Sequence, residues 1–171
     1  MAGIGSISGA WVLDLSRSDT FEDYLRCLGT PEMAIQHQVA AEQAYQSRNV
    51  IALDQFRLVI HKDTAVNRYT ERFELDQEQI SRTRTGDGVN QSMASLGGEN
   101  RLDGYMVVTT TNSSDGRQTL ETVEARQLLE GGLVHIQKLN MRKVDTGEQV
   151  VVTRTWVRVP MTQEDQMRLL G

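Results

Sequence analysis

The residues of this sequence with the most obvious capacity for catalysis or metal binding are three histidines and one cysteine. His37, His61 and His135 are far apart in the chain and show no spacing typical of metal ligands. Cys27 lies in an amphipathic segment, where a lone cysteine more often packs as a small apolar residue than acts as a nucleophile. No phosphate-binding loop, nucleophile elbow or dinucleotide fingerprint is present. The sequence therefore predicts no catalytic residue, no metal site and no cofactor.

The chain of 171 residues is acidic, with a formal net charge of −5 and a pI near 5.2. Nucleic-acid binding needs a basic face, so nucleic acid is not an expected partner. A single cysteine cannot form an internal disulfide and favours a reducing compartment. No segment approaches the roughly 18 consecutive apolar residues of a membrane-spanning helix. We expect a cytoplasmic, monomeric, single-domain protein.

Strand-like and helical patterns follow one another near the start of the chain. Residues 9–15 alternate in polarity, as in a strand with one buried face. Asp19 and Glu22 then resemble a capping box, and apolar residues follow at helical spacing. A second helix, rich in alanine and glutamine, begins after a Gly-Thr-Pro sequence. The pattern predicts a helix-turn-helix over about 19–46.

After Ser47 the apolar residues recur at every second position, which is typical of strands. With the first strand, the pattern predicts about ten strands without crossover helices, so the strands are expected to pair as antiparallel neighbours. Closing such a sheet into a barrel removes its exposed edges. We predict a mainly β, ten-stranded antiparallel up-and-down barrel of calycin or lipocalin-like type over 1–160, and a short, partly helical tail over 161–171. The expected turns lie at 54–55, 85–88, 97–98, 112–116, 130–132 and 145–147.

Several expected strands carry charged residues on both faces, as in RYTERFEL at 68–75 and QISRTRT at 79–85. In a solid sandwich such charges would be buried unpaired, at several kcal/mol for each ion. A barrel with a wet interior tolerates them, because water and ligand satisfy their hydrogen bonds. The apolar content of 39% and aromatic content of 5% are low and favour the same interpretation. We therefore predict an internal cavity.

Four motifs resemble, in order, the intracellular lipid-binding proteins, the fatty-acid-binding protein family. The first is G-x-W-x-L at 9–13 followed by F-x-x-Y-L-x-x-L-G at 21–29. FELDQE at 73–78 is similar to the family's F-x-L-G-Q-E, with Asp76 in place of glycine. The other two are RQLLEGGLV at 126–134, which is similar to a family hairpin, and VVTRTWVRV at 151–159, which is similar to the closing T-R-x-Y strand.

The resemblance implies a ten-stranded barrel whose mouth is covered by the two helices. In the family, an arginine on the eighth strand and an arginine and tyrosine on the tenth hold the ligand's carboxylate. The matching positions are Arg126, Arg154 and Trp156; an indole N–H donates as a tyrosine does but cannot accept. Glu124 shares the face of Arg126 in a regular strand and would weaken its capture of an anion. The residues assigned to the lid or portal are Phe21, Tyr24, Met33 and Ile35.

Each of these assignments has an alternative. Arg126 and Arg154 could be solvated strand charges, although Val150, Val152 and Trp156 share the face of Arg154 and favour an interior position. Trp156 and Trp11 could also be simple core residues.

The preferred function is non-catalytic transport of long-chain fatty acids or a similar amphipathic carboxylate. The alternatives are an enzyme or haem-type barrel that uses the same cavity, and a protein-interaction barrel without a ligand. The expected partner is a hydrophobic small molecule. Transient membrane contact is compatible with the sequence, but membrane insertion is not expected.

Overall fold

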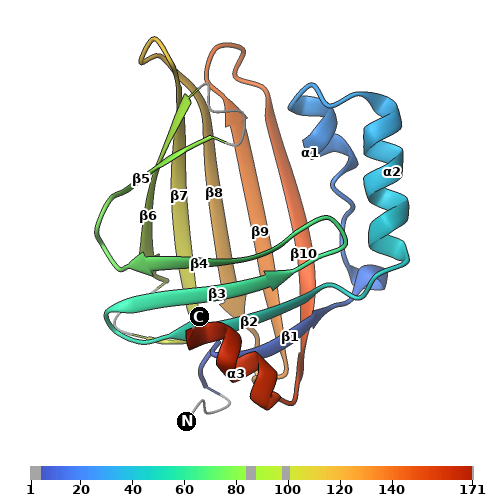
Figure 1. Cartoon of the computed structure of the whole chain (residues 1–171), viewed down its shortest axis with the longest axis vertical. Helices are drawn as coiled ribbons and strands as arrows, with labels where there is room; N and C mark the ends of the chain where they lie inside the picture. Colours follow the sequence, from blue (N-terminus) through green and yellow to red (C-terminus); the bar gives the residue numbers. More distant parts are fainter. Residues whose placement is uncertain (1–4, 84–87, 98–100, 171) are drawn as a thin grey trace.

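The computed structural model describes residues 5–83, 88–97 and 101–170 and forms a ten-stranded antiparallel barrel with helices on its surface (Figure 1). Residues 84–87 and 98, which belong to an expected strand end and two expected turns, lie outside the described residues. The elements are β1 (Gly9–Leu13), the 3-10 helix η1 (Leu15–Arg17), α1 (Glu22–Cys27), α2 (Glu32–Gln43), β2 (Arg48–Leu53), β3 (Arg57–Asp63), β4 (Arg68–Glu74), β5 (Gln79–Arg82), β6 (Gly88–Leu96), β7 (Gly104–Ser113), β8 (Gln118–Leu128), β9 (Val134–Lys143), β10 (Gln149–Val159) and α3 (Gln163–Leu170).

The strands pair in the order β4-β3-β2-β1-β10-β9-β8-β7-β6-β5, so β1 links the first and last parts of the chain through β10. In Figure 1, β1–β4 cross in front of β6–β10. The edges β4 and β5 leave the barrel nearly closed. At this seam the amide of Asp76 donates to the carbonyl of Ala94 on β6 at 2.8 Å. The predicted up-and-down barrel is confirmed.

One end of the interior is a dry apolar core. Arg158 closes this end, since its guanidinium donates to the carbonyls of Ser6, Ser8 and Gly132 and lies 4.3 Å from the ring centre of Trp11. Burial of this much apolar surface is the main stabilising contribution to a barrel of this size. The core consists of Ile7, Trp11, Leu13, Ile51, Leu53, Leu58, Ile60, Phe73, Leu75, Ala94, Tyr105, Val107 and Trp156.

The backbone conformation of Gly9 favours glycine, and Arg158 lies close to it. Its φ is +145°, a region that side-chain-bearing residues rarely adopt, and an added Cβ would lie 2.4 Å from Nη1 of Arg158. This conformation gives a physical reason for the glycine that opens the first motif.

The predicted helix pair is present: α1 and α2 stand beside the barrel, at the end reached by the β3–β4 hairpin (Figure 1). The capping box expected from Asp19 and Glu22 is wrong, because Phe21 precedes α1 and makes no side-chain cap. Asp19 instead binds β10: its carboxylate accepts from the amide of Thr153, and its own amide donates to the Thr153 carbonyl, both at 2.9 Å. Two hydrogen bonds between Asp19 and β10 therefore replace the expected capping bond and hold the start of the helical segment against the sheet.

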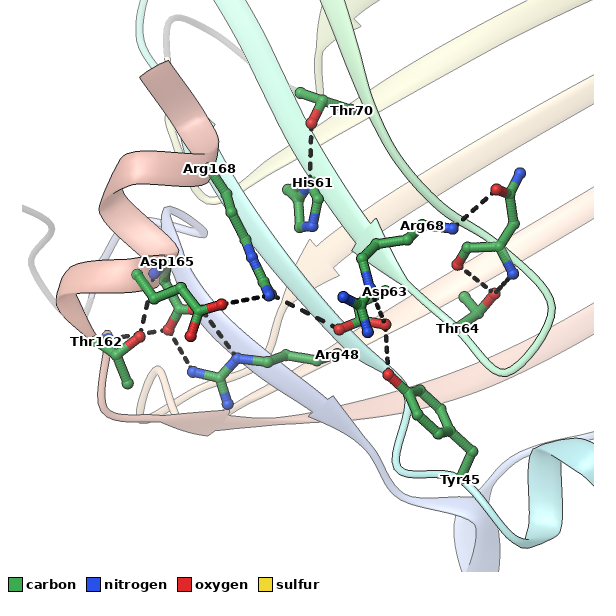
Figure 2. Close-up of polar contacts among 12 residues, drawn as sticks. Tyr45, Arg48, His61, Asp63, Thr64, Arg68, Thr70, Thr162, Asp165 and Arg168 are labelled. Carbon is green, nitrogen blue, oxygen red and sulfur yellow. Dashed lines mark hydrogen bonds and ion pairs between the residues drawn. The ribbon is translucent and has the colours of Figure 1, made fainter. Parts of the chain in front are cut away.

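The C-terminal helix α3 packs on β2 and β3, on the outside of the barrel (Figure 1). Thr162 and Asp165 cap its first turn reciprocally, with the amide of each donating to the side chain of the other at 2.9 and 3.1 Å. Asp165 is only 2% exposed and is also ion-paired with Arg48 of β2, whose Nε lies 3.1 Å from Oδ1 (Figure 2). The tail is therefore a docked element.

Asp63, the last residue of β3, joins this tail to the lid. Its carboxylate lies 3.6 Å from a guanidinium nitrogen of Arg168 on α3 and 3.2 Å from Nε of Arg68 on β4. It also accepts a hydrogen bond of 2.5 Å from the hydroxyl of Tyr45, which follows α2. Figure 2 shows these side chains converging on one carboxylate from three segments.

Asp165→Asn should lower the free energy of unfolding by about 2 kcal/mol, because it leaves Arg48 without its charged partner. Glu164→Gln is the matched control: Glu164 pairs with Arg168 but its side chain is 73% exposed, so a change within about 0.5 kcal/mol is expected. Urea unfolding of both variants measures the difference. Equal losses in the two would show that the Arg48–Asp165 pair does not hold the tail.

Asp76 has a φ of +61°, at the position where the family motif carries glycine. A left-handed backbone costs a residue with a Cβ about 1–2 kcal/mol, and aspartate is among the residues that tolerate it best. We expect Asp76→Gly to raise the free energy of unfolding by about 0.5 kcal/mol and Asp76→Ala to lower it by about 0.5–1 kcal/mol. Urea unfolding tests the order; a glycine variant less stable than the alanine variant would contradict it.

Candidate functional site

Two of the predicted site residues lie in one inward-facing row that crosses four strands. The register pairs Tyr105 of β7 with Arg126 of β8, Arg126 with Gln137 of β9, and Gln137 with Arg154 of β10. Trp156 follows two residues later on the same face of β10, because side chains alternate along a strand. The structure thus brings Arg126, Arg154 and Trp156 into neighbouring positions of the barrel wall.

Arg126 is 2% exposed and is held by residues of the barrel itself. Its Nε donates to Oε1 of Glu124 at 2.8 Å, and Nη1 lies 3.3 Å from Nε2 of His135. The guanidinium carbon lies 5.3 Å from the centre of the Trp156 ring. The carboxylate expected on the same face therefore pairs with this arginine.

A second cation enters the same cluster from the opposite wall. Nζ of Lys62 on β3 lies 2.6 Å from the carboxylate of Glu71 on β4 and 3.9 Å from that of Glu124 on β8. Burial opposes the charged form of Lys62, but the two glutamates outweigh it and raise its pKa. Burial likewise opposes ionisation of Glu124, but Lys62 and Arg126 lower its pKa to about 2. The two cations, Lys62 and Arg126, thus stand beside two carboxylates, Glu71 and Glu124, and the formal charges of the four residues sum to zero.

Arg154, in contrast, is paired with the lid. Its Nη1 and Nη2 donate to the two carboxylate oxygens of Glu42 on α2 at 2.9 and 2.5 Å, and Nη1 also donates to the carbonyl of Asp19 at 2.9 Å. The guanidinium lies 4.2 Å from the centre of the Phe21 ring. Arg154 is 3% exposed, so this is an inward-facing arginine with a carboxylate partner already in place.

Trp156 and His135 sit below these arginines. The indole N–H of Trp156 donates to Oε1 of Gln137 at 2.9 Å, so in this structure its hydrogen bond is made to a side chain of the barrel wall. His135 is fully buried, with its ring edge-on to Trp11 at 4.3 Å between centres. Because arginine is only a donor, Nε2 of His135 accepts from Arg126 and Nδ1 carries the proton. Burial and the charge of Arg126 hold the pKa of His135 well below its usual range.

The four residues assigned to the lid or portal lie in different environments. Phe21 packs under Arg154, and its ring centre lies 5.8 Å from that of Tyr24. Tyr24 is half-buried, and burial raises the pKa of its phenol. Ile35 is fully buried and anchors α2, whereas Met33 is 88% exposed and points to solvent.

Several inward-facing side chains near the charged cluster are polar and only partly buried. Ser92, Thr109 and Thr122 form an inward row on β6, β7 and β8, and each remains partly accessible. Lys62 and Glu124 also keep 15% of their side-chain surface accessible although they lie deep in the barrel. This part of the barrel wall is therefore polar and partly accessible, and the internal cavity expected from the sequence stays a prediction.

Two buried donors of the central row have no hydrogen-bond partner in the described part of the chain: the hydroxyl of Tyr105 and Nε of Arg154. Buried polar groups are nearly always hydrogen-bonded, to protein, water or ligand. Over residues 5–83, 88–97 and 101–170, no cluster of histidine, cysteine or carboxylate side chains could hold a metal ion. No helix within these ranges is long and apolar enough to cross a membrane.

Sequence reasoning missed Lys62, Glu71, Gln137 and Glu42. The first three carried a usable signal, since strand alternation places Lys62 on the face of Ile60, Glu71 on the face of Phe73, and Gln137 on the face of His135. Glu42 carried none, because the contact between a helix and a strand 112 residues away depends on how the lid docks.

Glu124→Gln should lower the free energy of unfolding at pH 7 by about 3 kcal/mol, because it leaves Lys62 and Arg126 buried without their shared partner. The folded-state pKa of Glu124, about 2, lies below its ordinary 4.5, so its contribution is present above pH 4.5 and is lost as the pH falls toward 2. The difference between wild type and variant should therefore narrow by about 2 kcal/mol between pH 7 and pH 3.

Urea unfolding at several pH values measures this difference. Glu121→Gln is the control, since Glu121 lies on the outer face of the same strand, 3.9 Å from Arg142 and 36% exposed. A Glu124→Gln penalty that stays constant with pH would contradict the assigned ion pair.

Comparisons with known proteins agree with the barrel. No protein-family model and no curated protein sequence matches the chain. Among solved structures, the REP1-NXSQ fatty acid transporter matches 91% of this chain and 98% of its own at 18% identity, with a TM-score of 0.61. A tyrosine-to-phenylalanine mutant of that transporter matches 90% and 98% at 19% identity, with a TM-score of 0.58. A Schistosoma mansoni fatty acid binding protein in complex with arachidonic acid matches 92% and 99% at 16% identity, with a TM-score of 0.59. This chain therefore has the fold of the fatty-acid-binding proteins.

Proposed function

We propose that this protein is a non-catalytic carrier that holds a long-chain fatty acid, or a similar amphipathic carboxylate, inside the barrel. The observation that carries the proposal is the central row, where Arg154 and Tyr105 each keep a buried donor without a partner in the described residues, near inward-facing polar side chains that stay partly accessible. A lipid head group that accepts hydrogen bonds would satisfy the donor of Arg154. The solved structures of the same fold include a fatty acid transporter and a complex with arachidonic acid, which supports this ligand class.

The alkyl chain and the head group of such a ligand would contribute differently to the free energy of binding. About 15 methylenes at ~0.8 kcal/mol each contribute about 12 kcal/mol before the costs of association, which are about 4–15 kcal/mol. A charge-assisted hydrogen bond contributes about 1.5–3 kcal/mol. The alkyl chain would therefore set most of the affinity, and Arg154 would set the preference for an acid.

The state of the interior histidine weighs against a haem-type or catalytic role. His135 is enclosed by Trp11 and Trp156, and its unprotonated nitrogen already accepts from Arg126. That nitrogen would have to leave Arg126 to bind iron or to act as a base, which would leave the guanidinium with Glu124 alone.

Arg154→Gln should weaken binding of palmitate about tenfold, which corresponds to the loss of one charged hydrogen bond, and should leave hexadecanol unchanged. Displacement of an uncharged fluorescent probe measures both affinities on the same sample. Mass spectrometry of lipid extracted from the purified protein separates a carrier from an interaction barrel without ligand. Equal losses for acid and alcohol would assign a structural role to Arg154, and binding of neither lipid by the wild type would contradict the carrier function.

A further inference from the structure

Glu42 of α2 occupies the position that the proposed function gives to a ligand's carboxylate. Both of its oxygens face the guanidinium of Arg154, at 2.9 and 2.5 Å, which is the two-pronged arrangement that a fatty acid would adopt on an arginine. The Phe21 ring and the Asp19 carbonyl complete the surroundings of the arginine. The head-group position therefore already holds a carboxylate when the lid is docked.

The charges of the interior make Arg154 different from the other buried cations. Lys62 and Arg126 are neutralised by Glu71 and Glu124, which belong to the barrel strands β4 and β8. Within the described residues, Arg154 is the buried cation of the interior whose carboxylate partner comes from a separate helix. An anion added beside the barrel-wall pairs would bring an uncompensated charge, whereas exchange for Glu42 keeps the charge around Arg154 balanced.

Glu42 is placed so that it can leave. Its side chain keeps 18% of its surface accessible, so the freed carboxylate reaches water without crossing the barrel. Ile35 is the buried residue of α2, and the residues of its C-terminal half are half-buried or exposed, so no fully buried apolar side chain opposes a shift of that half.

We propose that Glu42 is an internal competitor for the ligand's carboxylate and thereby determines which lipids the barrel accepts. An acidic lipid binds Arg154 only by displacing Glu42, which releases α2 at this contact. A neutral lipid, such as a fatty alcohol, binds with the Glu42–Arg154 pair intact and the lid docked. Glu42 therefore lowers the apparent affinity for acids and leaves that for neutral lipids unchanged. This inference rests on the proposed carrier function.

The test compares palmitate and hexadecanol on wild type, Glu42→Gln and Glu32→Gln, by displacement of an uncharged fluorescent probe. Glu42→Gln should raise the affinity for palmitate about tenfold and change that for hexadecanol less than twofold. Glu32→Gln removes the same charge from the same helix, but Glu32 pairs with Arg26 at the surface, so neither affinity should change. In an Arg154→Gln background, Glu42→Gln should have no further effect on palmitate.

Amide hydrogen exchange of the wild type adds a measurement that needs no variant. Residues 32–43 should exchange faster with palmitate bound than with hexadecanol bound, because only the acid displaces Glu42. Binding of both lipids with an unchanged ratio in Glu42→Gln, or equal exchange of α2 with either lipid bound, would overturn the inference and leave the carrier function standing. Binding of neither lipid by the wild type would overturn both.

Discussion

Pairwise neutralisation of charges inside the barrel is the constraint on which the rest of this structure depends. Lys62, Glu71, Glu124 and Arg126 come from three strands, and the sum of their charges is zero. An isolated ion at this depth would cost several kcal/mol, so none of the four can be removed without exposing the others to that cost. The Lys62–Glu124 contact also joins β3 to β8 across the interior, in a barrel whose β4 and β5 edges are not paired with each other.

The interior is arranged in layers with different physical roles. Below the charged cluster lies the dry core around Trp11, which contributes the burial of apolar surface. Arg158 closes this end through its hydrogen bonds to backbone carbonyls. Above the charged cluster lie inward-facing hydroxyl side chains that are partly accessible. Apolar burial and polar side chains thus occupy different depths of one barrel, so the upper layers tolerate polar residues that a uniform core would exclude.

The parts of the fold that follow from local patterns were predictable from the sequence. Strand alternation, hairpin turns and the helical period of the lid are properties of neighbouring residues, and so is the shared face of Glu124 and Arg126. Asp19 shows where this reasoning fails: its spacing to Glu22 fits a capping box, but Thr153, far along the chain, offers it two hydrogen bonds. The contact between Glu42 and Arg154 could not be predicted for the same reason, because no local pattern indicates which distant arginine a helix carboxylate will contact. The binding roles of Arg126, Arg154 and Trp156 are predictions from the sequence.

Asp63 connects the C-terminal helix α3 to the residue that follows the lid helix α2, Tyr45. The carboxylate is shared by Arg168 of α3, Arg68 of β4 and the hydroxyl of Tyr45. A protease cut before residue 163 would remove Arg168. The carboxylate of Asp63 would then have only Arg68 and Tyr45 as partners among these three, so we expect its interaction with Tyr45 to become stronger. Groups that share one partner do not contribute independently. The C-terminal helix therefore shares a partner with the segment that follows α2, although it lies on the outer wall of the barrel.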